Sequence, residues 1–272
     1  MQWVSAAVFM WVFISASPSV NATPAQNSTK PIIYNIIVEQ SLPHSQDAFT
    51  QGLVLHKDSM IESSGLYGRS FIQRFHPQTN QLERKRKLHR SIFAEGIAID
   101  NDRLYLLSWK RGKVSIYDPE NFELLDHLNY KGEGWGLASL NSQLIMSNGS
   151  ATLTYRSPKT FSNLNSIDVT LNQHPLQFLN ALASTDAQSP FGELIWANVW
   201  RDNRIFAIHP QSGEVVGLAD LSALAADNPS RTSDDVLNGI AWDTKKQGFW
   251  VTGKRWKTRY LIRLTPSDNQ AH

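Results

Sequence analysis

A short pattern of apolar and polar positions recurs five times along the chain. Each copy places one variable residue directly before a glycine or an alanine and then continues as an apolar run. Short apolar runs that are bounded by turn residues, with few helical periods between them, predict an all-β fold. The copies are Phe49–Leu55, Phe93–Ile99, Glu133–Ala138, Phe178–Ala183 and Val236–Trp242.

Each copy opens a longer unit, in which a second apolar strand is followed by a third that runs into a proline turn. The second strands start at Met60, Leu104, Leu144, Ile195 and Phe249. The prolines are Pro77, Pro119, Pro158, Pro210 and Pro266. They lie about 40 to 55 residues apart, close to the length of one four-stranded propeller blade.

The fifth unit ends at Pro266 without a fourth strand. An unassigned apolar segment, Ile32–Glu39, stands at the other end of the chain and can complete that unit. A ring closed in this way leaves no open sheet edge. We therefore predict a five-bladed β-propeller over residues 32–268, closed by the N-terminal strand.

Two segments exceed the repeat. Residues 163–190 are expected to lengthen the connections around the first strand of the fourth unit, and residues 219–235 the connection into the fifth. Leu218–Ala226 is expected to form a short helix that ends before Pro229. Long loops on a regular scaffold are often functional, and surface decoration is the alternative.

The first 22 residues resemble an export signal. An apolar stretch from Trp3 to Ala16 is too short to span a bilayer and precedes the small-residue sequence Val20-Asn21-Ala22. We expect an exported protein, periplasmic or secreted, with residues 23–31 as a flexible leader. An uncleaved anchor is the alternative for residues 1–22. The chain has no cysteine, so its core alone must hold the domain together, and a thiol nucleophile is excluded.

The net charge of +2 is small, and the one basic cluster, Arg84–Lys87, is typical of a solvated strand end. Nucleic acid is therefore not an expected partner.

In a propeller the first strand of each blade lines the central channel, so the five variable residues are expected to face one place. They are Gln51, Glu95, Trp135, Asn180 and Asn238. The second strands supply another ring: Gly65, Trp109, Gly149, Trp200 and Lys254. Apolar walls with a few convergent polar groups are typical of small-ligand sites. The two glycines are expected to leave room on one side.

Glu95 is the residue most suggestive of chemistry. Burial raises the pKa of a carboxyl, and a nearby Lys254 would lower it. A carboxyl balanced in this way can accept and release a proton. The alternative is an ion pair that only ties two blades together. For the tryptophans the alternative is packing between blades, which we expect for Trp196, Trp242 and Trp250.

At these residues the chain resembles the glutaminyl-peptide cyclotransferases of the plant and bacterial type, the glutamine cyclotransferase family. The resemblance runs in family order from about residue 34 to the C-terminus. Its stretches are Ala48–Leu53, Glu62–Gly68, Phe93–Gly96, Gly134–Ala138, Trp196–Trp200, Val236–Asp243 and Val251–Trp256.

The resemblance implies a propeller enzyme that converts N-terminal glutamine of peptides or proteins to pyroglutamate and releases ammonia. It places the acid/base glutamate at Glu95, beside Phe93. Substrate-lining aromatics fall on Phe49, Trp109, Trp135 and Trp200, and polar contacts on Gln51, Asn180 and Lys254. Relatives commonly carry two acidic residues where this chain has Ala181 and Ala183, so the resemblance does not settle the local loop or the substrate preference.

The reaction is intramolecular, so it requires no serine or cysteine nucleophile. We expect Glu95 and Lys254 to be catalytic, with Asn238 beside the other residues that bind substrate. No cofactor and no metal are expected, and the protein is expected to act as a monomer. Two alternatives remain: a propeller that binds a peptide without catalysis, and a metal-dependent propeller hydrolase.

Overall fold

The computed structural model describes Met1 and residues 30–267. The predicted export segment after Met1 and most of the predicted leader therefore lie outside the described residues. Regular structure in the described part is almost entirely β, as predicted. Three sheets have four strands each, with neighbouring strands antiparallel and in chain order.

The first of these sheets contains β2 (Thr50–His56), β3 (Ser59–Ser64), β4 (Phe71–Phe75) and β5 (Leu82–Lys87). The second contains β6 (Ala94–Asp100), β7 (Arg103–Ser108), β8 (Lys113–Tyr117) and β9 (Leu124–Asn129). The third contains β10 (Leu137–Leu140), β11 (Gln143–Met146), β12 (Thr152–Arg156) and β13 (Asn163–Asp168).

The remaining long strands form one eight-stranded sheet. Its order is β16 (Leu179–Thr185), β17 (Leu194–Val199), β18 (Arg204–Ile208), β19 (Val215–Asp220), β1 (Ile32–Pro43), β22 (Thr258–Pro266), β21 (Gly248–Gly253) and β20 (Leu237–Asp243). A small hairpin, β14 (Thr170–Leu171) and β15 (His174–Pro175), and the helix α1 (Ser222–Ala226) complete the described elements.

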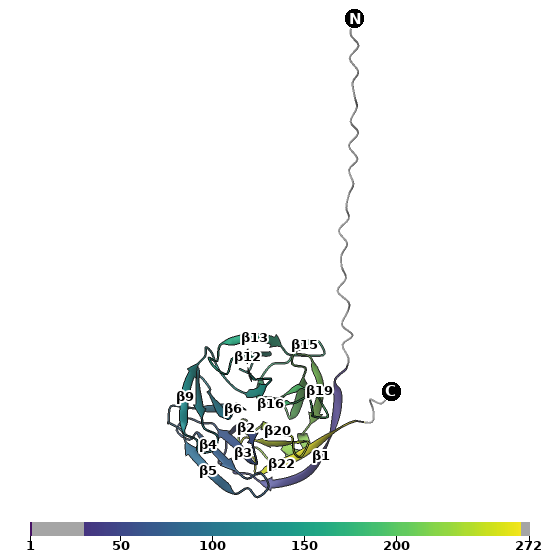
Figure 1. The fold of residues 1–272 in the computed structure, drawn as a ribbon. Helices are drawn as coiled ribbons and strands as arrows, with labels where there is room; N and C mark the ends of the chain where they lie inside the picture. Colours follow the sequence, from purple (N-terminus) through teal and green to yellow (C-terminus); the bar gives the residue numbers. More distant parts are fainter. Residues whose placement is uncertain (2–29, 268–272) are drawn as a thin grey trace.

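The N-terminal strand β1 lies against the C-terminal strand β22. The two pair antiparallel from Tyr34 opposite Pro266 to Pro43 opposite Thr258, and Figure 1 shows the purple and yellow strands side by side. The start of β1 also pairs in parallel with β19, from Ile32 opposite Gly217. This second pairing was not predicted, and it joins the fourth and fifth groups of strands into one sheet.

The first strand of each group lies near the centre in Figure 1, and later strands such as β5, β9 and β13 lie at the outside. Each first strand contacts the next in a closed cycle of β2, β6, β10, β16 and β20. The repeated glycine permits this approach. A Cβ on Gly96 would lie 2.4 Å from Leu137 N, and one on Gly136 would lie 1.9 Å from Asn180 O.

Apolar side chains fill the space between neighbouring groups of strands. Where β17 faces β21, the rings of Trp196 and Phe249 lie 4.7 Å apart, and Trp242 lies 4.8 Å from Phe249. Trp196, Trp242 and Trp250 are all buried, which confirms that they belong to the core.

Two predicted loop segments differ from the structure. Asn163–Asp168 is strand β13 rather than part of a lengthened loop, because it pairs with β12. The helix is shorter than predicted: Leu218 lies in β19, where it pairs with both Phe206 and Ile33, so α1 begins only at Ser222. Within the described chain no helix is long and apolar enough to cross a membrane.

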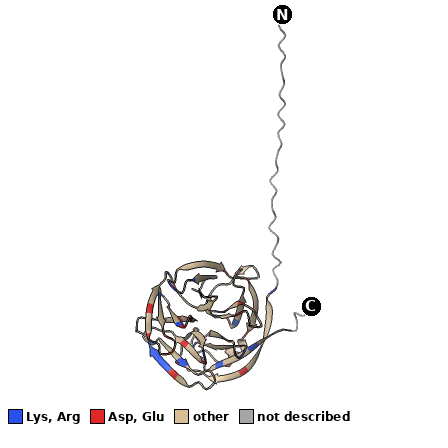
Figure 2. Cartoon of the chain, in the orientation of Figure 1, with Lys and Arg blue, Asp and Glu red and all other residues tan. Residues whose placement is uncertain are grey.

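The basic cluster Arg84–Lys87 lies on the exposed outer strand β5, as expected for a solvated run (Figure 2). Lys85 packs its ammonium 3.7 Å from the ring centroid of Phe71, and Arg84 Nε donates to Asn121 O. Both contacts are intramolecular, so they hold side chains of the cluster on the surface of the domain.

Candidate active site

A cavity of about 550 Å³ opens where the first strands begin, at one mouth of the central ring. It is lined by Phe49, Gln51, Leu66, Phe93, Glu95, Trp109, Trp135, Asn180, Trp200, Arg201, Asp234 and Lys254. The repeat did not predict Leu66, Arg201 and Asp234. Of the predicted site residues, all except Asn238 line this cavity.

Irregular pairing in the first strands aims the variable residues at the cavity. In β2, β6, β16 and β20 the register with the second strand shifts at the variable position. Such a bulge leaves a residue unpaired and re-aims its side chain. Serines of the preceding sheet hold the same segments: Ser63 Oγ donates to Glu95 O and Ser147 Oγ to Asn180 O, each at 2.7 Å.

Glu95 is only 4% exposed, and one of its oxygens accepts a hydrogen bond from Gln51 Nε2 at 2.9 Å. Burial raises the pKa of Glu95 well above its usual range, and the negative charge of Glu133 raises it further. Lys254 and the Gln51 donor oppose the rise in pKa without cancelling it. The carboxyl is thus held closer to the range in which it can both accept and release a proton.

Asn238 lies beneath Gln51 and fixes the orientation of its amide. Asn238 Nδ2 donates to Gln51 Oε1 at 3.0 Å and to Thr50 O at 2.9 Å. Because Gln51 Oε1 is occupied in this way, its Nε2 faces Glu95. The prediction that Asn238 lines the cavity is wrong: the side chain is fully buried and its donor is used by the protein.

Lys254 reaches the same cavity from the end of β21. It is 5% exposed, and its Nζ lies 4.8 Å from the ring centroid of Phe49. Burial lowers the pKa of Lys254, and the charges of Glu95, Asp234 and Asp235 oppose that change. Among the described residues no carboxylate lies within the 4.0 Å ion-pair limit of Lys254. The alternative of a closed Glu95–Lys254 pair therefore does not describe this geometry.

The prediction that the two glycines of the second ring leave open space is wrong. A Cβ on Gly65 would lie 2.4 Å from the ring of Phe93, and one on Gly149 would lie 2.7 Å from the ring of Trp135. The aromatic rings take the room that the missing side chains provide. Phe93 in turn lies 5.3 Å from Trp109.

Trp135 and Trp200 form two further walls, and their rings meet edge to face at 6.3 Å. Arg201 stacks on Trp200 with its guanidinium carbon 4.2 Å from the ring centroid. At the mouth, Arg201 pairs with Asp234 at 3.6 Å, and both side chains are half-exposed. Two charged side chains, Arg201 and Asp234, therefore lie beside the apolar walls of the cavity.

Glu133 supports two of the indoles and was not predicted as a functional residue. Its Oε2 accepts from Trp109 Nε1 at 2.8 Å and from Trp135 Nε1 at 3.1 Å. Burial alone would raise the pKa of Glu133, but the donors Trp135, Trp109 and Lys110 lower it. Glu133 opens the third copy of the repeat pattern, and its position two residues before Trp135 is the only sequence signal for it.

Asn180 presents an unused acceptor. Asn180 is 3% exposed, and its Oδ1 has no hydrogen-bond partner among the described residues. A buried unpaired acceptor costs free energy. The cost is recovered when a bound molecule donates to it.

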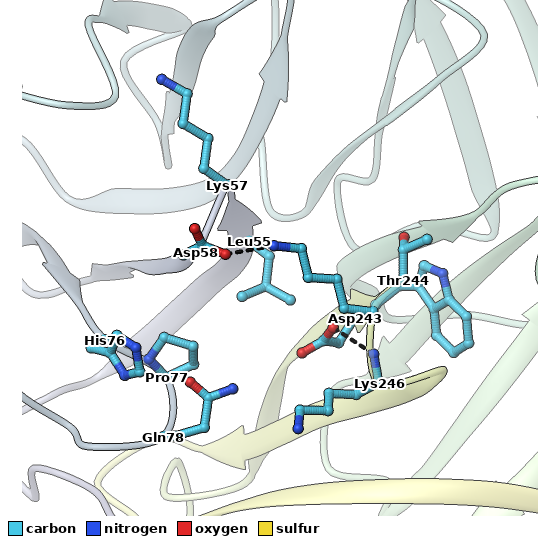
Figure 3. Close-up of a pocket in the computed structure, with 11 residues that line it drawn as sticks. Leu55, Lys57, Asp58, His76, Pro77, Gln78, Asp243, Thr244 and Lys246 are labelled. Atoms are coloured by element: carbon cyan, nitrogen blue, oxygen red, sulfur yellow. Dashed lines mark hydrogen bonds and ion pairs between the residues drawn. The ribbon is translucent and has the colours of Figure 1, made fainter.

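A second cavity, of about 460 Å³, lies between the first sheet and the end of β20 (Figure 3). Most of its charged groups are engaged within the protein. Lys245 pairs with Asp58 at 2.5 Å, and Asp243 accepts from Lys246 N and Trp250 Nε1. It has no counterpart of Glu95, so the first cavity is the better candidate.

The part of the chain that the structure describes offers no evident donor set for a metal. Within residues 30–267 the structure places no group of three or more His, Cys, Asp or Glu side chains where they could hold an ion.

Comparisons with known proteins agree on one family. Residues 8–264 match the family model described as glutamine cyclotransferase. The chain is 34% identical over 236 residues to the glutaminyl-peptide cyclotransferase of Arabidopsis thaliana, covering 85% of this chain and 72% of the relative. The crystal structure of Myxococcus xanthus glutaminyl cyclase superposes with a TM-score of 0.81 at 31% identity, covering 88% of this chain and 100% of that one.

Proposed function

The chain belongs to the glutamine cyclotransferase family, and from this premise we propose that the cavity around Glu95 cyclises N-terminal glutamine of peptides or proteins to pyroglutamate with release of ammonia. The observation that carries the assignment to this cavity is one buried carboxyl and one buried ammonium facing a space walled by three indoles.

The proposal includes the architecture. We interpret the five groups of strands as the blades of a propeller, with β1 as the outer strand of the last blade. The closed cycle of first strands and the pairing of β1 with β22 support this interpretation. The cavity then occupies one mouth of the propeller channel, where residues from all five blades meet.

The walls serve to fold the substrate. The α-amine of glutamine must reach its own side-chain amide carbon, and orientation of the two groups contributes much of the acceleration of such a reaction. Trp109, Trp135 and Trp200 surround the cavity with flat, rigid faces. They exclude extended conformers of the side chain and much of the water.

Glu95 then transfers the proton that the reaction must move. A free α-amine titrates near roughly 7.7, so a large share is already neutral at neutral pH. As its nitrogen forms the new C–N bond, Glu95 accepts a proton from it. Glu95 returns that proton to the amide nitrogen, the old C–N bond breaks, and ammonia leaves with the lactam intact.

Lys254 and Asn180 complete the scheme. The ammonium of Lys254 stabilises the negative charge that develops on the amide oxygen. The unpaired Asn180 Oδ1 accepts a hydrogen bond from the amide nitrogen that becomes ammonia. Gln51, held by Asn238, keeps Glu95 oriented.

The scheme requires no metal, so a chelator should leave turnover unchanged. Loss of turnover in chelator that returns with added metal would favour the metal-dependent hydrolase instead. A propeller that only binds peptides has no use for a buried carboxyl with a raised pKa that faces the same cavity as a buried ammonium, so the surroundings of Glu95 argue against this alternative.

The deciding experiment is incubation of the purified protein with a glutamine-leading peptide and with the same peptide led by asparagine. Ammonia release and a loss of 17 mass units, the mass of ammonia, are expected for the first peptide only. Binding without ammonia release would identify the non-catalytic alternative.

We also propose that the protein is exported and acts as a monomer. The apolar stretch from Trp3 to Ala16 and the small-residue sequence Val20-Asn21-Ala22 after it support export. Fractionation of the native host and gel filtration test the two points.

A further inference from the structure

We infer that Glu133 is a positioning residue that clamps Trp109 and Trp135 in the orientation that binds substrate. The inference rests on the proposed function, because the value of the clamp is the shape that it gives the glutamine side chain. Glu133 does not line the cavity itself. It therefore acts through the two indoles.

The geometry of the clamp is specific. One oxygen, Oε2, receives both indole N–H groups, at 2.8 and 3.1 Å. The two tryptophans come from different sheets: Trp109 follows β7 in the second, and Trp135 precedes β10 in the third. A single carboxylate thus ties together two walls of the cavity. The backbone adds one hydrogen bond between the same two segments, from Gly134 N to Trp109 O at 3.1 Å.

The outer side of the clamp is held by Lys110. Its Nζ lies 3.5 Å from Glu133 Oε1 and 4.0 Å from the ring centroid of Trp109. The carboxylate is therefore supported on both sides. Trp200, by contrast, has no described hydrogen bond at its Nε1. The clamp therefore holds the indoles of Trp109 and Trp135 but not that of Trp200.

Glu133 also places a negative charge near the reacting carboxyl. Lys254, Gln51 and Glu133 are the groups whose charge or hydrogen bonding acts on the ionisation of Glu95, and Lys110 partly neutralises Glu133. Removing the charge of Glu133 lowers the pKa of Glu95. The acidic limb of the pH profile, which follows the ionised base, must then move to lower pH.

Two substitutions separate the clamp from the charge. Glu133→Gln keeps an oxygen that can accept from both indoles but removes the charge. We expect its KM to stay within about threefold of the parent, with the acidic limb of kcat/KM moved to lower pH. Glu133→Ala loses the acceptor as well, and we expect KM to rise about tenfold or more because two partly buried N–H groups lose their partner and the indoles lose their fixed orientation.

Tryptophan fluorescence reports on the surroundings of Trp109 and Trp135 and does not depend on catalysis. Glu133→Ala should shift the emission and increase quenching by acrylamide, and Glu133→Gln should resemble the parent. Glu193→Gln is the matched control: that carboxylate is exposed and bonds only Asn141 in the described structure. It should change neither fluorescence nor pH profile.

Several outcomes overturn the inference. An alanine variant with parental KM and fluorescence does so, as does a glutamine variant as impaired in KM as the alanine variant. If Glu133→Ala fails to fold, the test rests on Glu133→Gln. An acidic limb that does not move in that variant, or a changed fluorescence, would then overturn the inference. A parent protein that releases no ammonia would instead refute the proposed function, while the fluorescence arm still tests the clamp.

Discussion

Glu95 carries its charge at a cost to the folded protein. Burial raises its pKa well above the usual range, so the folded state binds the proton more tightly than the unfolded state. The stabilisation that this proton gives is complete below the ordinary carboxyl pKa and is lost as pH rises through the raised value. A residue kept under these conditions is expected at a site of function rather than of stability.

Glu95→Gln tests both consequences. The variant should lose turnover by about a thousandfold or more, since the amide cannot accept the proton. Its thermal midpoint should match the parent at acid pH and exceed it at alkaline pH, because the buried charge is gone. Activity within about tenfold of the parent, or ~1.4 kcal/mol of barrier, would remove Glu95 from the mechanism.

Lys254 should act on pH dependence in the opposite sense to Glu133. The positive charge of Lys254 lowers the pKa of Glu95, so Lys254→Gln should move the acidic limb of kcat/KM to higher pH. It should also lower kcat, because the developing oxyanion loses its cation. A pH series on the variant and on Lys246→Gln, a lysine of the second cavity, checks the direction. An unmoved limb would place Lys254 outside the site.

At this scale the sequence predicted the residues at the two aligned positions and missed those outside them, namely Leu66, Glu133, Arg201 and Asp234. Glu95 and Lys254 occupy positions set by strand periodicity, so alignment alone brought them to one cavity. Asn238 shares that alignment, yet it turns beneath Gln51 because its donor is bound by Thr50 O. Glu133 lies in a loop, where no period fixes which way a side chain points.

The first strands are the elements that build the site. The first three bring their backbones against the next first strand at the glycine that follows the variable residue, Gly52, Gly96 or Gly136, which is why the pattern survives there while that residue varies. A Cβ on Gly136 would lie 1.9 Å from Asn180 O. Neither atom belongs to a flexible side chain, so the clash cannot be relieved by a rotamer change.

Gly136→Ala should therefore damage both stability and site. We expect a loss of a few kcal/mol, in the range of severe single substitutions, and reduced turnover because Asn180 must shift. Denaturant unfolding together with peptide kinetics measures both. Ala181→Gly at the aligned position is the control and should cost only about 0.5–1 kcal/mol. Equal effects of the two changes would contradict the close-approach argument.

The elements themselves were predicted where spacing was regular. The second strands begin, and the third strands end, near the predicted residues, because they are short apolar runs, buried along nearly their whole length and bounded by turn residues. The errors lie at Asn163–Asp168 and at Leu218, both beside the longest connections. There, pairing with a distant strand decides the structure, and neither composition nor helix propensity reveals such a partner.

At the scale of the molecule, ring closure joins the first described strand to the last. Strand β1 pairs with β22 along its length and meets β19 at its start. Tyr34 packs into the same junction, 5.5 Å from the ring of Phe191 and 6.0 Å from that of Trp196. The sequence predicted the first pairing because the fifth unit lacked a strand, whereas nothing in it predicted the parallel pairing with β19.

This junction predicts how the protein tolerates shortening. A chain that begins at residue 30 keeps β1 and should unfold cooperatively with full turnover. A chain that begins at His44 lacks β1, which exposes the edges of β19 and β22 and leaves Trp196 without Tyr34. Strand β20, the first strand of the fifth group, belongs to the same sheet as β1, and so does β21, which carries Lys254 at its end. Removal of β1 should therefore displace Lys254 and abolish turnover.

Thermal unfolding and peptide turnover of the two shortened chains decide the matter. We expect the shorter chain to unfold at a much lower temperature and to associate through its open edges. Adding a synthetic peptide of residues 30–43 should recover part of the activity, since the missing strand binds the edge that it normally covers. A chain that begins at His44 with parental stability and turnover would show that the sheets hold their ring without β1.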